Sequence, residues 1–233
     1  MEAVVMAAGE GRRLRPLTER WAKPVLPIDG RPVLASLLRE LAAAGLQRLW
    51  LVTGHLAEQV EALAGDGSGF GLEVRVVRQP ERLGSADAVV RAFRAGAEPP
   101  VLVAGADTLF SRGDIGRFLG DAAGYAGAIA VRRDPPPDPP HRHAVRVEGD
   151  LVTRVLDADP SNPLAGAPLW VLDEAVSRFL DPLPGKPPYE LASAFELAVA
   201  AGERVAGVEI GKTRDLTRPE DVIVESFPYL RGL

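Results

Sequence analysis

The chain has 233 residues, of which 46% are hydrophobic and 25% are charged, and its formal net charge is −5. This length and balance suit a single α/β domain, residues 1–233, with a sizeable core. The acidic balance argues against nucleic acid as a partner, and the short apolar start is neither a signal peptide nor a membrane span. Without cysteine, disulfides and thiol chemistry are excluded, and the cytoplasm is the expected compartment.

The first predicted strand, residues 3–6, runs directly into a glycine loop with two arginines at its exit, Ala7-Ala8-Gly9-Glu10-Gly11-Arg12-Arg13. The glycines let the backbone approach a ligand closely, and successive N–H groups in such a loop bind anions. Arginine adds forked donors suited to phosphate, and Lys23 follows ten residues after Arg13. The pattern favours a triphosphate site. A lone G-x-G is weak evidence, however, and the spacing matches neither the dinucleotide fingerprint nor the P-loop.

A longer pattern covers the first 32 residues: G-x-G-x-R-L-x-P-L-T, then K-P-x-L-P, then G-x-P. It resembles the signature of the sugar-phosphate nucleotidylyltransferases, which include glucose-1-phosphate thymidylyltransferases and uridylyltransferases. The resemblance implies a Rossmann-like three-layer α/β/α fold with a mixed, mostly parallel sheet (the nucleotide-diphospho-sugar transferase fold). It also implies that Arg13 and Lys23 are catalytic and that Ala8, Gly9 and Gly11 bind the nucleotide. Only three of the 27 basic residues are lysines, so arginine has been used almost everywhere else. We therefore expect the lysine at position 23 to be needed for its compact charge, in contact with a phosphate.

Periodicity predicts a helix at 32–44, a strand at 49–53, a helix at 57–63 and a strand at 72–77. The segment from Gln79 to Ala88 then reads as a turn that opens a helix ending near residue 95. An ordinary turn in which Ser85 caps the helix would explain it. The segment also resembles the family's Q-x-x-x-x-G-[TS]-A turn, which implies that Gln79 and Gly84 read the nucleotide base.

The next strand, residues 100–104, is nearly all apolar, as in a parallel sheet covered on both faces. Asp107 follows it, where open α/β sheets bind ligands, although an aspartate also commonly caps a turn. The resemblance to the family's G-D-x-[LI]-F segment favours a metal ligand there. The resemblance of residues 208–221 to G-x-W-x-D-[IV]-x-T-P-E-D implies that Asp215 is the second ligand, and Mg²⁺ is the expected metal.

A helix at 114–123 and a strand at 126–131 precede a proline-rich run, residues 134–143, which should be a stiff exposed excursion. His141 and His143 in this run could bind a metal, but an H-x-H pattern in a proline-rich loop is more often incidental. Residues 144–147 and 151–156, separated by Glu-Gly-Asp, predict a β-hairpin.

The acceptor half departs from the family pattern after this hairpin. Ala158 stands where family members carry the lysine of E-K-P that holds the sugar phosphate, and Pro168 lies near a glycine position. Either the acceptor differs or another group replaces the lysine. Lys186, just before a helix predicted at 188–201, is a candidate substitute, and Glu190 is a candidate acceptor contact, although a solvated helix-start glutamate is about equally frequent.

The resemblance implies that an acceptor phosphate attacks the α-phosphate of an NTP and releases pyrophosphate, with Mg²⁺ as cofactor. A sugar 1-phosphate is the first choice of acceptor. Phosphocholine, a molybdopterin-like cofactor phosphate, and a nucleotide-binding regulatory subunit without turnover remain alternatives. A homo-oligomer is left open, and a C-terminal β-helix domain is not expected in residues 1–233.

Overall fold

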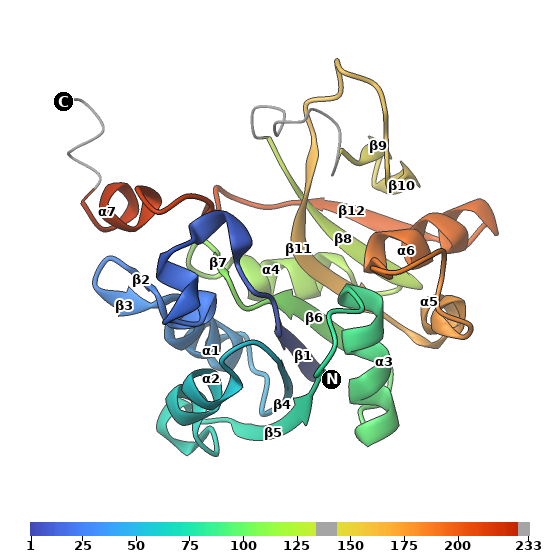
Figure 1. Ribbon diagram of the computed structural model, residues 1–233. Coiled ribbons are helices and arrows are strands. Elements are labelled where there is room, and N and C mark those ends of the chain that lie inside the picture. The colour runs from blue at the N-terminus through green and yellow to red at the C-terminus, as the bar shows by residue number, and fades with distance from the viewer. Residues whose placement is uncertain (134–143, 228–233) are drawn as a thin grey trace.

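The computed structural model describes residues 1–133 and 144–227, and its largest element is a nine-stranded mixed sheet (Figure 1). The strands follow the order β5 (Glu73–Arg78), β4 (Arg48–Thr53), β1 (Glu2–Ala7), β6 (Val101–Gly105), β11 (Ala165–Leu172), β8 (Gly127–Arg132), β12 (Val205–Glu209), β10 (Leu151–Arg154) and β9 (Arg146–Glu148). β1 pairs in parallel with β4 and β6, whereas β11 runs antiparallel between β6 and β8. β12 is again parallel to β8, so the expected mixed, mostly parallel sheet is confirmed.

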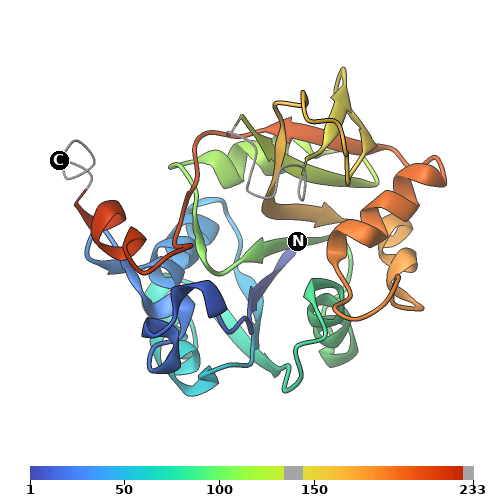
Figure 2. The same cartoon turned by 45° about the horizontal axis from the view of Figure 1, so that its top comes forward.

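Helices cover both faces of this sheet because its central strands are apolar on both sides. Ala3 and Val5 of β1 share one buried cluster with α1 (Val33–Ala43), α2 (Ala57–Ala64) and α4 (Asp114–Asp121). Val4, which points the other way, packs in a second cluster with α3 (Ser85–Ala95), α5 (Glu174–Ser177) and α6 (Leu191–Ala200). Figures 1 and 2 show α1 and α2 on one side of the strands and α3, α5 and α6 on the other, which confirms the three-layer arrangement.

The direction of the parallel strands decides where the loops gather. β6 and β8 are each antiparallel to β11, so β1, β4, β6, β8 and β12 all run the same way. Their carboxyl ends therefore meet at one edge of the sheet, where open α/β sheets bind ligands. The glycine loop follows β1 and Asp107 follows β6, so both predicted motifs lie at this edge.

A short antiparallel pair joins two distant parts of the chain at the same edge. β7 (Thr108–Leu109) pairs with β13 (Arg214–Asp215), and Asp215 lies opposite Thr108. The segment after β6 is thereby held against the segment after β12. As a result Asp107, which directly precedes β7, and Asp215 in β13 are brought together although 108 positions separate these two expected metal ligands in the sequence numbering.

The remaining elements are short. β2 (Pro27–Ile28) and β3 (Arg31–Pro32) form a tight hairpin, and α7 (Asp221–Ser226) lies beside it (Figure 1). Single 3₁₀ turns are found at Arg12–Leu14, Leu17–Glu19, Lys23–Val25, Ser68–Phe70 and Arg178–Leu180. In the described ranges, 1–133 and 144–227, no helix combines the length and the apolar character needed to cross a membrane.

One predicted helix begins later than the sequence suggested. The helix expected at 188–201 starts at Leu191, because Tyr189 is engaged in strand-like contacts: its N–H donates to Leu83 O and its C=O accepts from Ala86 N–H. The predicted hairpin is confirmed by the antiparallel pairing of β9 and β10. The proline-rich run at 134–143, with His141 and His143, lies outside the described residues.

Candidate active site

The glycine loop forms one wall of a cavity of about 340 Å³ at the carboxyl edge of the sheet. Gly11 has φ +60°, and a Cβ there would lie 2.9 Å from the Thr18 side chain, whose hydroxyl donates to Gly11 O. The packing therefore requires glycine at this position. A Cβ on Gly9 would meet nothing within 4 Å, so this glycine faces open space on the cavity side.

Cationic residues outnumber acidic residues in the cavity lining. Arg12, Arg13, Lys23 and Arg82 contribute side chains, against the carboxylates of Glu10 and Asp107; Met6, Ala7, Gly9, Gly11, Leu14, Pro24, Leu216 and Thr217 complete the lining. Glu10 accepts from Arg12 Nε at 3.0 Å and lies 2.8 Å from Arg82 Nε. The hydrogen bond from Arg12 is the main cause that lowers the pKa of Glu10, with the Arg82 charge adding to it. This excess of positive charge suits a polyanion such as a triphosphate.

Lys23 lies at the start of a 3₁₀ turn, and its ammonium forms an ion pair with the carboxylate of Asp107. The Lys23 side chain is 14% exposed, whereas that of Asp107 is 38% exposed. The two residues were predicted separately, as a phosphate contact and a metal ligand, and the structure brings them together. Their direct contact was not predicted, since nothing local links residues 84 positions apart.

Asp215, the second expected metal ligand, is held on both carboxylate oxygens. Thr108 Oγ1 donates to Oδ1, and Arg132 Nη1 donates to Oδ2 at 2.9 Å; Thr213 Oγ1 lies 3.5 Å from the same oxygen. The carboxylate lies beside the cavity rather than in its wall, which continues through the next two residues, Leu216 and Thr217.

The two aspartates fit a hard divalent cation. Each is partly exposed, and each offers carboxylate oxygens of the type that Mg²⁺ prefers. In the described part of the chain, no group of three or more His, Cys, Asp or Glu side chains is arranged to hold a metal. The donor set therefore suits a cation that takes its other ligands from phosphate and water, as Mg²⁺ commonly does.

Gln79 and Gly84 lie next to each other but outside the cavity lining. Gln79 is 6% exposed, and its Nε2 donates to Gly84 O at 3.0 Å and to the buried carboxylate of Asp87 at 2.7 Å. Because both partners only accept, the orientation of the Gln79 amide is fixed. Gly84 has φ +102°, and its Cα faces the Tyr189 backbone so closely that a Cβ would lie 2.2 Å from Tyr189 O. Their role in reading a base stays a prediction.

The turn at Gly84 is joined to the segment that carries Glu190. Ser85 Oγ donates to Glu190 Oε2 at 2.8 Å and accepts from Leu191 N–H at 2.7 Å. Ser85 thus satisfies a backbone donor at the start of α6 instead of capping its own helix. Lys186, the other candidate acceptor contact, is exposed and does not line the cavity.

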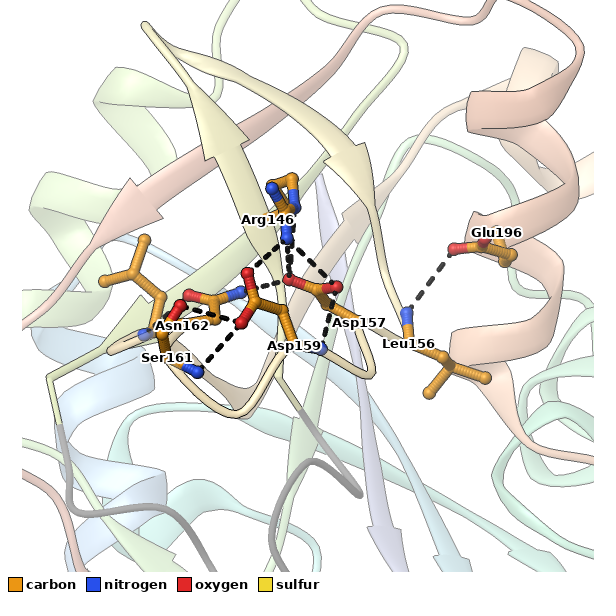
Figure 3. A network of polar contacts seen from close by, with 8 residues as sticks. Arg146, Leu156, Asp157, Asp159, Ser161, Asn162 and Glu196 are labelled. Atoms are coloured by element: carbon orange, nitrogen blue, oxygen red, sulfur yellow. Dashed lines mark hydrogen bonds and ion pairs between the residues drawn. The ribbon is translucent and has the colours of Figure 1, made fainter.

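The position of the missing lysine is occupied by an acidic network (Figure 3). Ala158 lies between Asp157 and Asp159, and Arg146 contacts both carboxylates, at 3.1 Å and 2.9 Å. Burial raises the pKa of Asp157, but hydrogen bonds from Asn162 and the Asp159 N–H, with the Arg146 charge, outweigh it and lower the pKa. The positive charge of Arg146 is therefore already matched by two carboxylates.

The sequence reading missed two arginines of this region. Arg82 lines the cavity from within the Gln79–Gly84 turn, and Arg132 holds Asp215 from the end of β8. The signal for Arg132 was available, because it follows an apolar parallel strand in the same way that Asp107 does. For Arg82, the only signal was a cation inside a turn already suspected of binding a nucleotide.

The glycine loop, its cations and two aspartates lie together at the carboxyl edge of a mixed α/β sheet, an arrangement that suits a phosphate-bearing ligand. The family model described as Nucleotidyl transferase matches residues 2–143, more than half of the chain. The chain therefore belongs to the nucleotidyl transferase family, as its first 32 residues had suggested.

Individual relatives agree with this assignment. The chain is 30% identical over 239 residues to a mannose-1-phosphate guanylyltransferase of Mycobacterium tuberculosis, covering 100% of this chain and 66% of the relative. It is 35% identical over 187 residues to a CMP-5'-(3-aminopropyl)phosphonate synthase of Streptomyces rubellomurinus, covering 76% of this chain and 29% of the relative. This chain thus spans only part of either protein. The crystal structure of a UDP-glucose pyrophosphorylase from Acinetobacter baumanii superposes with a TM-score of 0.77 at 22% identity, over 98% of this chain and 92% of that one, which shows the shared fold.

Proposed function

We propose that this protein transfers a nucleoside monophosphate from an NTP to a sugar 1-phosphate and releases pyrophosphate in an Mg²⁺-dependent reaction. The observation that carries the proposal is the cavity in which the glycine loop, Arg13 and Lys23 face Asp107. Cations and loop N–H groups accommodate a triphosphate, and the carboxylate supplies the hard oxygen that a metal–triphosphate complex needs. The named relatives in the family support the same reaction class.

In this reaction an acceptor phosphate oxygen forms a bond to the α-phosphorus, the bond from that phosphorus to the bridging oxygen breaks, and its electron pair leaves with pyrophosphate. A phosphate monoester is already nucleophilic, so no general base is required, and positioning and charge neutralisation supply the rate enhancement. Arg13 contacts the departing β- and γ-phosphates. Lys23 exchanges its contact with Asp107 for the charge that develops near the α-phosphate.

Asp107 and Asp215 are the residues that would hold Mg²⁺, which when bound would supply positive charge to the reacting phosphates. The backbone of Ala8, Gly9 and Gly11 binds the phosphates, and Gln79 and Gly84 read the base. Glu190 contacts the acceptor, since Ser85 fixes one of its carboxylate oxygens at the start of α6.

The first test is thermal unfolding with ATP, CTP, GTP, UTP and dTTP in turn, with and without Mg²⁺, for the wild type and for Asp107→Asn. A ligand that binds only the native state raises the melting temperature. We expect an Mg²⁺-dependent rise for at least one NTP that the Asp107→Asn variant loses. A rise that needs neither Mg²⁺ nor Asp107 would favour a nucleotide-binding subunit without turnover instead.

The second test measures pyrophosphate release with the responding NTP and a panel of acceptors. The panel contains glucose, mannose and N-acetylglucosamine 1-phosphates, together with phosphocholine and 3-aminopropylphosphonate. The last two compounds belong in the panel because Ala158 lies within the acidic network and because one relative is named for a phosphonate product. Turnover with a hexose 1-phosphate is expected, and turnover with only a non-sugar acceptor would replace the sugar in the proposal.

A further inference from the structure

Among the described residues, the acceptor half of the site lacks an obvious partner for a phosphate dianion. Ala158 replaces the expected lysine, and the nearby Arg146 is matched by Asp157 and Asp159. Lys186 is exposed, and the ion pairs of the two aspartates in the described residues are made by Lys23 and Arg132 instead. An acceptor phosphate brought to the α-phosphate of an NTP nevertheless adds negative charge to an already anionic site, so a cation is required on the acceptor side.

Arg132 has the location that this cation needs. It is the last residue of β8, and β8 is parallel to both β6 and β12 in direction, so Arg132 lies at the same sheet edge as Asp107. Its Nη1 donates to Asp215 Oδ2 at 2.9 Å and also contacts Thr213 Oγ1. The Arg132 side chain is 20% exposed, and Arg132, like Asp215, lies beside the cavity rather than in its lining.

The two aspartates and their cations form an ordered array across the sheet edge. Lys23, in the segment after β1, pairs with Asp107 after β6; Arg132, at the end of β8, pairs with Asp215 after β12. Thr108, which follows Asp107 directly, joins the two pairs by donating to Asp215. One cation thus belongs to the nucleotide half of the sheet, and the other belongs to the half beyond β11.

We propose that Arg132 binds the phosphate of the acceptor and takes the place of the lysine that this chain lacks at position 158. A guanidinium presents five N–H donors in a planar fork that matches a phosphate, and one arginine can contact a carboxylate and a phosphate together. Asp215 orients the fork, as a carboxylate does in many charge-assisted pairs. The inference rests on the proposed nucleotidyl transfer and names the residue that selects a phosphorylated acceptor.

The test compares Arg132→Ala, Arg132→Lys and the control Arg133→Ala by steady-state pyrophosphate release. The NTP and acceptor are the pair on which the wild type is most active, and Mg²⁺ is saturating for each variant. Arg133 is the adjacent arginine, 61% exposed and paired with Glu209 at 2.9 Å, so its loss removes the same charge without touching Asp215.

We expect Arg132→Ala to raise the KM for the acceptor by about 10- to 100-fold, the range for a lost charge-assisted hydrogen bond. The KM for the NTP should change less than about threefold. Arg132→Lys should recover part of the acceptor affinity, and Arg133→Ala should resemble the wild type. An unchanged acceptor KM with a raised Mg²⁺ requirement would overturn the proposal, because Arg132 would then serve only to hold Asp215.

The two proposals fail in different ways. If the wild type releases no pyrophosphate with any NTP and acceptor, nucleotidyl transfer itself is wrong. If the wild type is active and Arg132→Ala keeps the acceptor KM, nucleotidyl transfer stands and the assignment of Arg132 is refuted. Thermal unfolding shows whether Arg132→Ala still folds. If it does not, Arg132→Gln replaces it, because glutamine keeps hydrogen-bond donors toward Asp215 but removes the charge. The same rise in the acceptor KM is expected for Arg132→Gln.

Discussion

Replacing Gly84 with alanine probes the turn that the sequence assigns to base recognition. Gly84 has φ 102° and ψ 176°, a region that essentially only glycine adopts, and forcing another residue there costs about 1–3 kcal/mol. In addition, the new Cβ would lie 2.2 Å from Tyr189 O and 2.5 Å from Tyr189 N, so the segment before α6 must move. Overpacking of this kind costs about 1–3 kcal/mol more. We therefore expect a loss of about 2–6 kcal/mol in the free energy of unfolding.

Gly202→Ala is the matched control, because Gly202 also has positive φ, +89°, but a Cβ there meets nothing within 4 Å. It should cost only about 1–2 kcal/mol. Urea unfolding followed by circular dichroism measures both losses in the free energy of unfolding. The melting temperature of Gly84→Ala should be at least about 4 °C below that of the wild type, since a protein of this size loses about 2–4 °C per kcal/mol. If the two variants lose equal stability, the close approach of Gly84 to Tyr189 carries no energetic weight and the reasoning fails.

Three further predictions concern the cavity and its border. Lys23→Arg should lower kcat by about 10- to 100-fold in the pyrophosphate-release assay, because a planar guanidinium does not reproduce the compact charge that Lys23 places beside Asp107. Full activity of the variant would refute the need for a compact charge. Arg214 joins two elements by donating to Asp29 on the β2–β3 hairpin at 3.0 Å and to Glu225 on α7 at 2.7 Å. Arg214→Ala should therefore lower the free energy of unfolding, measured in urea, by about 1–2 kcal/mol. An unchanged urea midpoint would show that this ion-pair cluster is not stabilising. The hydrogen bond from Arg214 lowers the pKa of Asp29 below its ordinary value of 3.8. The ion pair therefore stabilises the fold above that pH, and this stabilisation is lost as the pH falls through the lowered pKa. Asp29→Asn should flatten the decline in the free energy of unfolding measured from about pH 5 to pH 3, and an equal decline in both proteins would contradict this prediction.

The parts of the fold that local sequence determines were predictable. The strand before Gly9 and the helices at 33–43 and 85–95 follow from apolar periodicity and from glycine stops, and their observed limits agree closely with the predicted ones. The insertion of β11 antiparallel between β6 and β8 was not predicted. It depends on the pairing of Leu169–Leu172 with residues of β6 more than 60 positions earlier, and no local pattern specifies such a partner.

The delayed start of α6 shows how a tertiary contact overrides a local signal. The helix was expected to begin at Pro188, and proline is a favoured first residue of a helix. Tyr189 instead gives both of its backbone groups to Leu83 and Ala86, in a turn about 105 residues earlier in the chain. The energy of those hydrogen bonds and of the close packing on Gly84 outweighs one additional turn of helix.

The same distinction separates the two halves of the candidate site. The nucleotide half is encoded mostly by contiguous residues, since the loop, Arg13 and Lys23 fall within one short stretch, and a motif could therefore reveal it. The acceptor half draws Arg132, the Arg146 network and Asp215 from segments that only the sheet brings together. A motif can show there that a lysine is missing, but not which cation compensates. The parallel direction of β8 and β12 supports the proposal of Arg132, because it places Arg132 beside Asp215 at the carboxyl edge of the sheet.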